Sequence, residues 1–444
     1  MSQILPSDGF VDASVSTWTC PFCPLLCDDG PTCAVSRQRL ALLDAVADRP
    51  EAATPRVAGQ PVTLAEALAA ATTLLRDAGQ PLIAGWGTDV AGARALYRLA
   101  CASGAISDAG PDAAASDAQS EALRALQDRG GYTTTLAELR ERAELIVFIG
   151  SWAPDRAPRL LERALQGRAD RPPRLVHLGL AGGDDAVPAE VAGDGFCVPV
   201  ERRVFAVPDA QPAHPANLAD LADLADLALS LKLAIDRRPG ADPMLATLAG
   251  ELLASPYAVL VWEPGRLGPH AALVIERLQQ VIARLNATTR AAALPIGGAQ
   301  GMLTAQQVHA WLSGLPLRSR VGPRGLEHDP LRYGLGRLLD DGSVDALVWT
   351  GAFPAMPAPD TVLPRLLLVS ADVAATPGAC GDEAAAIVIP VASPGVQHGG
   401  HLFRTDTVVL MPLHPSPTAP IGLAGLPSVA RVVGDLLALL EHAR

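Results

Sequence analysis

Residues 63–102 read TLAEALAAATTLLRDAGQPLIAGWGTDVAGARALYRLACA and place a short apolar strand between two helices. Thr63 and Glu66 have the spacing of a capping box, which predicts that a helix begins here. The run Pro81–Gly87 has the length of a buried strand, and a second helix is predicted over Ala91–Ala102. A buried strand between helices is typical of a parallel sheet that is covered on both faces.

The same unit recurs along the chain. The other runs with the character of buried strands are Leu145–Gly150, Leu175–Leu178, Tyr257–Trp262, Ala346–Thr350, Leu366–Ser370 and Ala385–Val391. Strands that alternate with helices predict parallel sheets, in which ligands bind beyond the carboxyl ends of the strands. The loops expected at those ends are Trp86–Val90, Ser151–Arg159, Glu263–His270, Gly297–Gly301 and Gly351–Pro357.

Composition and charge narrow the class of protein. The 444 residues carry a net charge of −12, and 49% of them are hydrophobic. We see no basic stripe, which argues against nucleic acid or an anionic membrane as partner. We also see no secretion signal and no apolar run of about 18 residues, the length that a membrane-spanning helix needs. The sequence therefore predicts a cytoplasmic globular protein.

Four of the seven cysteines lie close together near the N-terminus. Cys20, Cys23, Cys27 and Cys33 follow the spacing C-x2-C-x3-C-x5-C. Four thiolates on one short loop could hold a [4Fe–4S] cluster or a tetrahedral zinc ion. The third interpretation is a group of buried thiols with no metal. The clustering itself indicates a reducing compartment, because a disulfide framework would spread its cysteines more widely.

Weaker candidates each have a structural interpretation that we prefer. The adjacent Asp28 and Asp29 are expected to fix backbone amides around the cysteine loop rather than to act as a catalytic pair. The histidines His398 and His401 are expected to be structural, and the glycines of 297–301 to form an ordinary loop rather than a phosphate site. The triple Leu-Ala-Asp repeat of Leu218–Leu229 predicts a solvated helix or linker, because its period of three drifts around a helix.

The ten residues at 20–29, CPFCPLLCDD, resemble the amino-terminal motif of the B subunit of formylmethanofuran dehydrogenase, a family of molybdopterin oxidoreductases. In that family the motif supplies three ligands of a [4Fe–4S] cluster, and a fourth cysteine follows a short hairpin. Cys33 fits the fourth place. The resemblance continues in order through shorter blocks at Thr63–Ala67, Pro81–Trp86, Ala125–Asp128, Leu294–Ile296, Ile389–Pro390 and Gly399–Arg404.

One element of the active family is missing. There a cysteine or selenocysteine, followed by histidine, ligates molybdenum or tungsten just before the block that matches Ala125–Asp128. The corresponding stretch here, Ala109–Arg124, contains neither Cys nor His. Ser116 and Asp117 are hard oxygen ligands and poor substitutes for a soft thiolate. The resemblance therefore implies a chain without molybdopterin and without a catalytic residue of its own.

A relative that keeps the fold but lacks this ligand resembles the B subunit of the formyltransferase/hydrolase complex of methylotrophic bacteria. That resemblance implies a non-catalytic scaffold whose partners are a formyltransferase, an amidohydrolase-like chain and a third chain of the same complex. The complex would move formyl groups between tetrahydromethanopterin and a methanofuran-like carrier and would release formate. Two alternatives stay open: an active molybdenum or tungsten formylmethanofuran dehydrogenase, and an Fe–S electron-transfer protein.

The resemblance also implies a domain plan. It predicts two Rossmann-like domains with parallel sheets, arranged as in molybdopterin oxidoreductases, and a small cysteine-bearing domain at residues 1–60. The first α/β domain is expected at 61–135 and 336–444, with the second inserted at 136–335. The chain is then expected to return to the first sheet at Asp345–Thr350.

Overall fold

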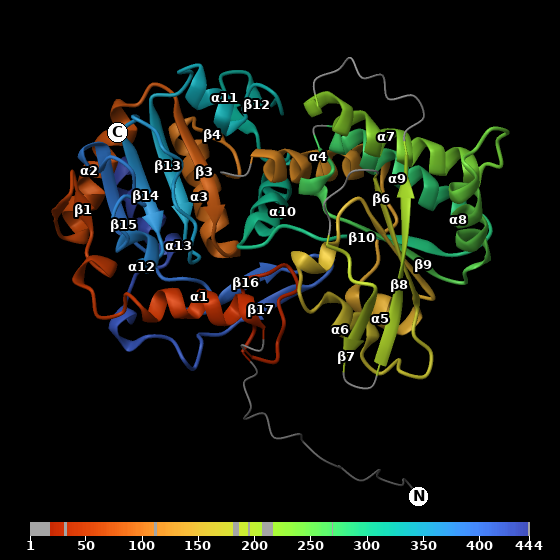
Figure 1. Cartoon of the computed structure of the whole chain (residues 1–444). Coiled ribbons are helices and arrows are strands. Elements are labelled where there is room, and N and C mark those ends of the chain that lie inside the picture. The colour runs from red at the N-terminus through yellow and green to blue at the C-terminus, as the bar shows by residue number, and fades with distance from the viewer. Residues whose placement is uncertain are drawn as a thin grey trace, which may run out of the picture.

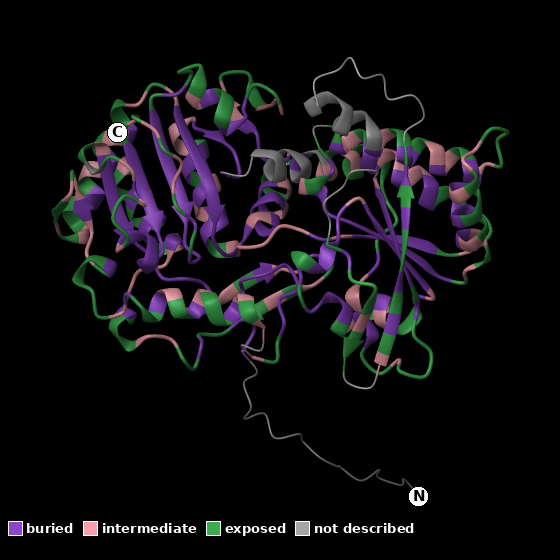
Figure 2. Cartoon of the chain, viewed as in Figure 1, coloured by how far each residue is buried: buried purple, intermediate pink, exposed green. Residues whose placement is uncertain are grey.

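The computed structural model describes residues 18–30, 33–110, 113–180, 186–193, 196–206, 216–268 and 270–442, with the backbone alone at 113–119, 121, 216–223 and 383. Two large β-sheets lie side by side, and helices cover each of them (Figure 1). The central strands of both sheets are buried, whereas the outer faces of the helices are exposed (Figure 2). The predicted α/β class, with parallel strands, is confirmed.

Within the described residues, the first sheet has nine strands in the order β12-β11-β4-β3-β13-β14-β15-β1-β2. The five from β4 to β15 run parallel, and the two pairs at the edges are antiparallel. Their bounds are β1 Arg56–Val57, β2 Gln60–Pro61, β3 Pro81–Gly87, β4 Ile106–Ser107, β11 Ser319–Gly322, β12 Gly325–His328, β13 Ala346–Gly351, β14 Arg365–Val369 and β15 Ala386–Pro390.

Helices cover both faces of the first sheet because alternate strand residues point to opposite sides. Ile83 of β3 faces one core, under α2, α3, α10 and α13, and its neighbours Leu82 and Ala84 face another, under α11 and α12. The bounds of these helices are α2 Leu64–Asp77, α3 Val90–Ser103, α10 Met302–Ser313, α11 Leu335–Asp340, α12 Ala371–Ala374 and α13 Val429–His442.

The second sheet has six strands within the described residues, in the order β10-β9-β5-β6-β8-β7, and its first five are parallel. The strands are β5 Leu145–Ile149, β6 Arg174–Leu180, β7 Glu190–Gly193, β8 Phe196–Phe205, β9 Ala258–Trp262 and β10 Ala291–Pro295. One face packs against α7 Ala216–Ile235, α8 Pro243–Ala254 and α9 Ala271–Leu285, and the other against α5 Leu136–Arg142 and α6 Leu160–Leu165.

The chain rejoins the first sheet earlier than the sequence predicts. Asp345–Thr350 was expected to mark the return, and most of it does form β13, which pairs with β3. However, β11 already pairs with β4, and β12 pairs with β11. These strands have four residues each, and Arg320 and Glu327 form an ion pair between them. Because both strands are short and carry charged residues, the sequence contains no apolar run that would predict them.

The Leu-Ala-Asp repeat also differs from expectation. It lies in α7, and where its side chains are described they are not uniformly solvated, because Leu224 and Leu227 are buried in the core under the second sheet. Ala228 and Leu231 continue the same face. The four residues follow the i, i+3, i+4, i+7 spacing of an apolar helix stripe. In its C-terminal half, α7 therefore has an apolar face with helical spacing rather than a period of three, and this face packs against the second sheet.

The two sheets are joined by elements from both ends of the chain. Helix α1 Ala34–Asp44 and the hairpin of β16 Gly400–Phe403 and β17 Leu410–Leu413 lie along the bottom of the molecule in Figure 1. The preceding cysteine segment reaches both halves. Cys20 packs in a core with Ala371 of α12, whereas Cys23 and Cys27 pack in the core that α5 and α6 form with the second sheet.

Candidate functional site

The four cysteines predicted as metal ligands lie at the junction of the two halves. Cys20, Cys23 and Cys27 are buried in a loop that closes where the Cys20 amide donates to the Cys27 carbonyl at 2.8 Å. Cys33 is less buried, stands at the N-cap of α1, and its thiol lies 3.7 Å from the hydroxyl oxygen of Ser36. Three of the thiols therefore share one buried loop, and the fourth begins the next helix.

Hydrogen bonding, burial and neighbouring charges shift the pKa values of the three buried thiols in different directions. The Cys23 thiol donates to the sulfur of Cys27; this bond lowers the pKa of Cys27, as do the nearby guanidinium groups of Arg163 and Arg159. The same bond and burial raise the pKa of Cys23. Burial raises the pKa of Cys20 to about 12. Cys27 is thus the thiol that ionises most readily in this loop.

The predicted cluster or zinc site is not decided by this geometry. Among the residues that the structure describes, no three or more His, Cys, Asp or Glu side chains lie together as the ligands of a metal ion would. A tetrahedral thiolate site needs its sulfurs about 2.3 Å from a common ion. The site at Cys20, Cys23, Cys27 and Cys33 stays a prediction, and no step of function is derived from it.

Two acidic residues attach the cysteine loop to α6. Both guanidinium nitrogens of Arg159 donate to Asp29, at 2.6 and 2.7 Å, and Arg159 also pairs with Glu162. Arg163 lies 2.8 Å from Asp29 and 3.6 Å from Asp28. The sequence predicted that these carboxylates would hold backbone amides. The structure gives them guanidinium partners from a distant helix, which local sequence could not indicate.

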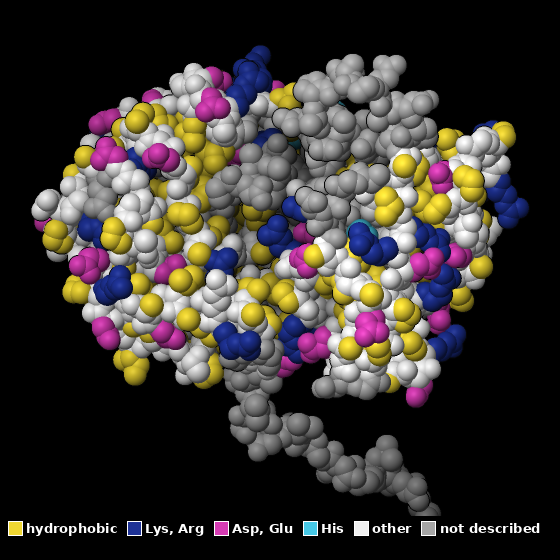
Figure 3. Space-filling model, in the orientation of Figure 1, with side chains coloured by type: hydrophobic (Ala, Val, Ile, Leu, Met, Phe, Trp, Pro, Cys, Tyr) yellow, Lys and Arg dark blue, Asp and Glu magenta, His cyan; other side chains and the backbone are white. Residues whose placement is uncertain are grey.

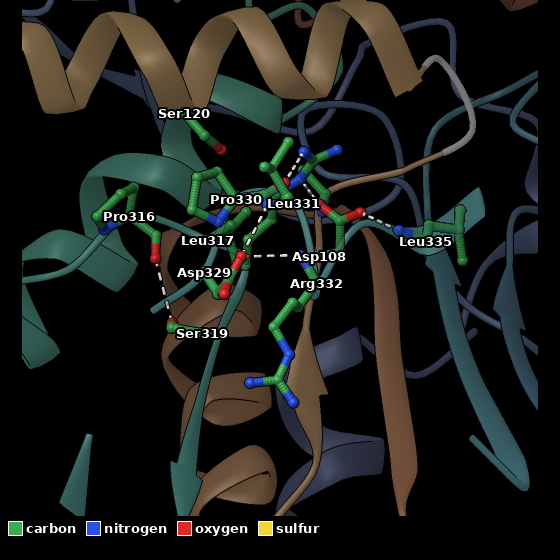
Figure 4. A network of polar contacts seen from close by, with 12 residues as sticks. Asp108, Ser120, Pro316, Leu317, Ser319, Asp329, Pro330, Leu331, Arg332 and Leu335 are labelled. Carbon is green, nitrogen blue, oxygen red and sulfur yellow. Dashed lines mark hydrogen bonds and ion pairs between the residues drawn. The ribbon is translucent and has the colours of Figure 1, made fainter. Parts of the chain in front are cut away.

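A buried polar network holds the carboxyl end of β4 (Figure 4). Asp108 follows this strand and accepts hydrogen bonds from the amides of Ala109 and Leu335, at 2.7 and 2.6 Å. It also pairs with Arg318, which donates to the carbonyl of Pro330. The network fixes β4, β11 and the start of α11 relative to one another.

This network adjoins the stretch in which the resemblance would place a metal thiolate. Ser120, on α4 Ala113–Arg129, accepts a hydrogen bond of 2.7 Å from Gln306 of α10, whose other amide atom accepts from the Leu317 backbone. The side chains of Ser116 and Asp117, weighed as oxygen ligands, lie outside those that the structure describes. The described part of the stretch is held by structural hydrogen bonds.

A cleft of about 790 Å³, including its open mouth, lies beyond the carboxyl ends of β9 and β10. Trp262 and Pro295 end these two strands and line the cleft. The opposite walls come from α4, α9, α10 and the turn between β16 and β17, and include Leu126, Ile275 and Leu303. This is the edge at which parallel sheets bind ligands, and Pro264 and Gly297, on its lining, belong to two of the predicted loops.

Two buried polar atoms of the cleft have no hydrogen-bond partner among the described residues. They are the indole nitrogen Nε1 of Trp262 and the carboxylate oxygen Oδ1 of Asp406. The exposed fractions of these residues are 0% and 2%. The other oxygen of Asp406 accepts from Arg404 at 2.6 Å and from the Leu136 amide at 3.3 Å. The sequence did not single out either residue, because Trp262 looks like an ordinary residue at the end of a strand and Asp406 like an ordinary residue in a turn.

The remaining sequence candidates are the glycine loop 297–301 and the two histidines. Gly301 has a φ of +83°, and a Cβ there would collide with the carbonyl of Thr88, so the loop 297–301 is shaped to pass close to the loop after β3. The Nδ1 atom of His398 lies 2.5 Å from the Gly399 carbonyl. His401 is exposed on β16.

On the face shown in Figure 3, basic and acidic side chains are interspersed among hydrophobic ones. In the described part of the chain, none of the helices combines the length and the apolarity needed to span a membrane.

Fold and site together define an α/β protein with two helix-covered sheets, a buried cysteine loop at their junction and a cleft at the carboxyl edge of the second sheet. No family model matches the sequence. The chain is 30% identical over 346 residues to the B subunit of the formyltransferase/hydrolase complex Fhc of Methylorubrum extorquens, a match that covers 76% of this chain and 84% of the relative.

The solved structures agree with this relative. The crystal structure of the formyltransferase/hydrolase complex FhcABCD from Methylorubrum extorquens, in complex with methylofuran, contains a chain that matches with a TM-score of 0.69 and 26% identity. The match covers 88% of this chain and 99% of that one. The chain belongs to the family of the B subunit of the formyltransferase/hydrolase complex. The sequence resemblance to the bacterial B subunit is confirmed.

Proposed function

We propose that this chain is a non-catalytic scaffold of a formyltransferase/hydrolase complex. The observation that carries the proposal is the likeness to the B subunit of Fhc, together with a structural match that covers nearly the whole of one chain of the FhcABCD complex. Its partners would be a formyltransferase, an amidohydrolase-like chain and a third chain. The complex would transfer formyl groups between tetrahydromethanopterin and a methanofuran-like carrier and would release formate, in the cytoplasm.

The scaffold role is supported by the chemistry of Ala109–Arg124. This stretch offers no thiolate or imidazole to hold molybdenum or tungsten. Immediately before this stretch, Asp108 forms a buried ion pair with Arg318 and accepts hydrogen bonds from two backbone amides. A chain of this kind can position other subunits and can lie close to the carrier that moves between them.

We also propose the finer features of the fold. Both sheets would belong to Rossmann-like domains arranged as in molybdopterin oxidoreductases, with the small cysteine-bearing domain at 1–60. The sheet formed by residues 145–295 supports the insertion of 136–335 between 61–135 and 336–444, and β11 and β12 argue that the insertion closes before residue 319. A structural [4Fe–4S] cluster or zinc ion at the four cysteines is part of the proposal.

The decisive experiment is purification of the tagged chain from its native host, with identification of the chains that co-purify and analysis of the metal content. We expect a formyltransferase and an amidohydrolase-like chain in constant ratio to the bait, and zinc, iron or neither. Molybdenum or tungsten at about one per chain would instead support a formylmethanofuran dehydrogenase. Iron and sulfide together with an electron-transfer partner would support an Fe–S electron-transfer protein.

A further inference from the structure

We propose that a surface formed by α3, α10 and the hairpin of β16 and β17 binds another subunit of the complex, one with an apolar contact surface bordered by acidic side chains. Helix α3 packs against both α10 and β16, so the three elements form one continuous surface (Figure 1). The inference rests on the proposed function, because it requires a complex in which this chain has partner subunits. We call this surface the docking face.

The hairpin contributes apolar side chains to the docking face because alternate residues of a strand point to opposite sides. Leu402 of β16 points inward and is buried in a small core with Phe353. Its neighbours His401 and Phe403 point outward, and Leu410 of β17 lies opposite Phe403 in the ladder. The outward side of the hairpin therefore carries Phe403 and Leu410 side by side.

Trp311 of α10 is the main anchor of the docking face. The other five of the six tryptophans are at most 4% exposed, whereas Trp311 is 56% exposed. Its ring packs edge to face against Phe403, with 5.0 Å between the ring centroids, so it is held in place although it is exposed. An ordered aromatic side chain offers a large contact area and loses little entropy on binding. Tryptophan is accordingly enriched among the residues that contribute most of the binding free energy at protein interfaces.

Two arginines of α3 make one edge of the docking face positive. Arg94 and Arg98 lie about one helical turn apart, are exposed, and have no ion-pair partner among the residues that the structure describes. Arg94 lines a hollow together with His401, so this edge adjoins the hairpin. Of the described residues that line this hollow and the next one along α3, Asp89 alone is acidic, and it is buried at the N-cap of α3.

This charge distribution indicates which partner fits. In a symmetric contact between two copies of this chain the same surface would meet itself, and its described part offers no exposed acidic side chain to Arg94 and Arg98. A different subunit with acidic side chains around an apolar centre is complementary in both respects. The docking face is therefore a contact with another subunit rather than with a second copy.

The first test compares the exposure of Trp311 in the isolated full-length chain and in the complex purified from the native host. Hydroxyl-radical footprinting with mass spectrometry measures the oxidation rate of each residue, and the same spectra identify the chains present. We expect the oxidation of Trp311 to slow by about tenfold in the complex, because the rim of an interface excludes water from its centre. Val362, which is 92% exposed and precedes β14 at the opposite edge of the first sheet, is the internal reference and should keep its rate.

The second test measures the Kd of this chain for its partners by mass photometry of diluted complexes that contain variant chains. Trp311→Ala is expected to raise the Kd by at least about tenfold, because it removes the anchor. Arg94→Glu is expected to raise it by about tenfold, because it brings two negative charges together. The matched controls are Val362→Ala and Arg290→Glu, at exposed residues before β14 and β10, and both should leave the Kd unchanged.

The outcomes separate this inference from the proposed function. A complex in which Trp311 is oxidised as fast as in the isolated chain, or a Kd that neither Trp311→Ala nor Arg94→Glu changes, would overturn the docking face and leave the proposed function intact. If no complex forms around the tagged chain, both proposals fail. If Trp311 is already protected in the isolated chain and that chain has the mass of a dimer, a second copy occupies the surface and the inference is wrong.

Discussion

At the residue scale, Arg159 is the side chain that joins the cysteine loop to the second half of the molecule. It is almost buried, with 11% of its side chain exposed, and it holds both oxygens of Asp29. That bond, with the nearby positive charge, lowers the pKa of Asp29. Loss of the guanidinium would leave the Asp29 carboxylate without its two shortest hydrogen bonds.

We therefore predict that Arg159→Gln lowers the free energy of unfolding by about 2 kcal/mol, the value of a hydrogen-bonded charged pair that is partly shielded from water. Urea denaturation followed by circular dichroism measures the change. Arg140→Gln is the matched control, because its pair with Glu141 is exposed and such pairs contribute less than about 1 kcal/mol. Equal losses in both variants would contradict the anchoring role.

His309 gives the molecule a dependence on pH. Its ring is buried, with Nδ1 2.9 Å from the Leu315 carbonyl and Nε2 3.3 Å from the Ser319 hydroxyl, and burial lowers its pKa to about 4. The unfolded chain takes up this proton near pH 6.5 and the folded chain only near pH 4. The stabilisation is fully present above pH 6.5 and is lost as the pH falls from 6.5 to 4.

The loss across this window is predicted to reach roughly 3 kcal/mol, since each unit of pKa corresponds to about 1.4 kcal/mol. Urea unfolding at pH 7.5, 6.0 and 4.5 measures it, and His309→Gln is expected to flatten the slope. His442→Gln, at an exposed residue near the C-terminus, should keep the slope of the original protein. An unchanged slope in His309→Gln would reject His309 as its source.

Single residues divide into those that local sequence can identify and those that it cannot. The four cysteines and Asp28–Asp29 can be recognised from their spacing in the sequence; the structure places Cys20, Cys23 and Cys27 in one loop, with Cys33 at the start of the next helix. Arg159 acquires its role from its contact with Asp29, which is distant in the sequence, and the cleft that Trp262 and Asp406 line is assembled from separate parts of the chain. No single window of sequence contains these combinations, so no local pattern could have found them.

At the element scale, helix α2 shows what a local sequence motif can predict. The capping box predicted from Thr63 and Glu66 is present: the Thr63 hydroxyl accepts from the Glu66 amide, and the Glu66 carboxylate accepts from the Thr63 amide at 2.8 Å. Both partners lie within one turn of helix. The sequence alone therefore contains all the information that sets this helix start.

Thr63→Ala is predicted to lower the free energy of unfolding by about 1 kcal/mol, the usual value of an N-cap. The control Thr73→Ala lies in the same helix, where Thr73 donates to the Ala69 carbonyl. It should leave the stability unchanged within about 0.5 kcal/mol, because alanine has the higher helix propensity. Thermal unfolding of the two variants side by side provides the comparison; a larger loss in Thr73→Ala would contradict the cap.

The strands were predictable where both faces are buried. All five residues of β5, β9, β14 and β15 are buried, and each strand is a continuous apolar run in the sequence, apart from the buried Arg365 that begins β14. β8 was missed because buried and exposed residues alternate along it, and Glu201, Arg202 and Arg203 interrupt its apolar pattern. Periodicity therefore finds the central strands and loses those at the edges.

At the scale of the whole molecule, strand order lies beyond any local pattern. β3 pairs with β13, far along the chain, and the second sheet forms entirely between them. Apolar runs indicate where strands form but not which strands pair, because all of them offer a partner similar backbones and similar side chains. The family resemblance predicted that the chain returns to the first sheet at Asp345–Thr350. Strands β11 and β12 join that sheet earlier in the chain, which the resemblance did not predict.

The last prediction concerns the dehydrogenase chemistry that we expect this chain to lack. In the loop after β3, the carboxylate of Asp89 accepts from the Gly92 amide at 2.9 Å and so occupies the N-terminus of α3. A negative charge there repels the pyrophosphate of a pterin dinucleotide, which would otherwise bind at such a helix start. In the loop after β4, Ala109–Arg124 offers no thiolate for molybdenum or tungsten. We therefore expect both requirements of the dehydrogenase reaction to be missing, each at a different loop of the first sheet.

We therefore predict that the isolated chain does not oxidise formylmethanofuran with viologen dyes, whereas a complex that contains it exchanges formyl groups without any electron acceptor. The first assay, on the isolated chain, requires an electron acceptor, and the second, on the complex, does not, so together they separate a scaffold from a dehydrogenase. Replacement of Asp89 by Asn serves as the control, because it removes the repelling charge but restores no thiolate, and it too should stay inactive with dyes. Dye-dependent oxidation by the unmodified chain, together with molybdenum or tungsten in the same preparation, would establish the dehydrogenase instead.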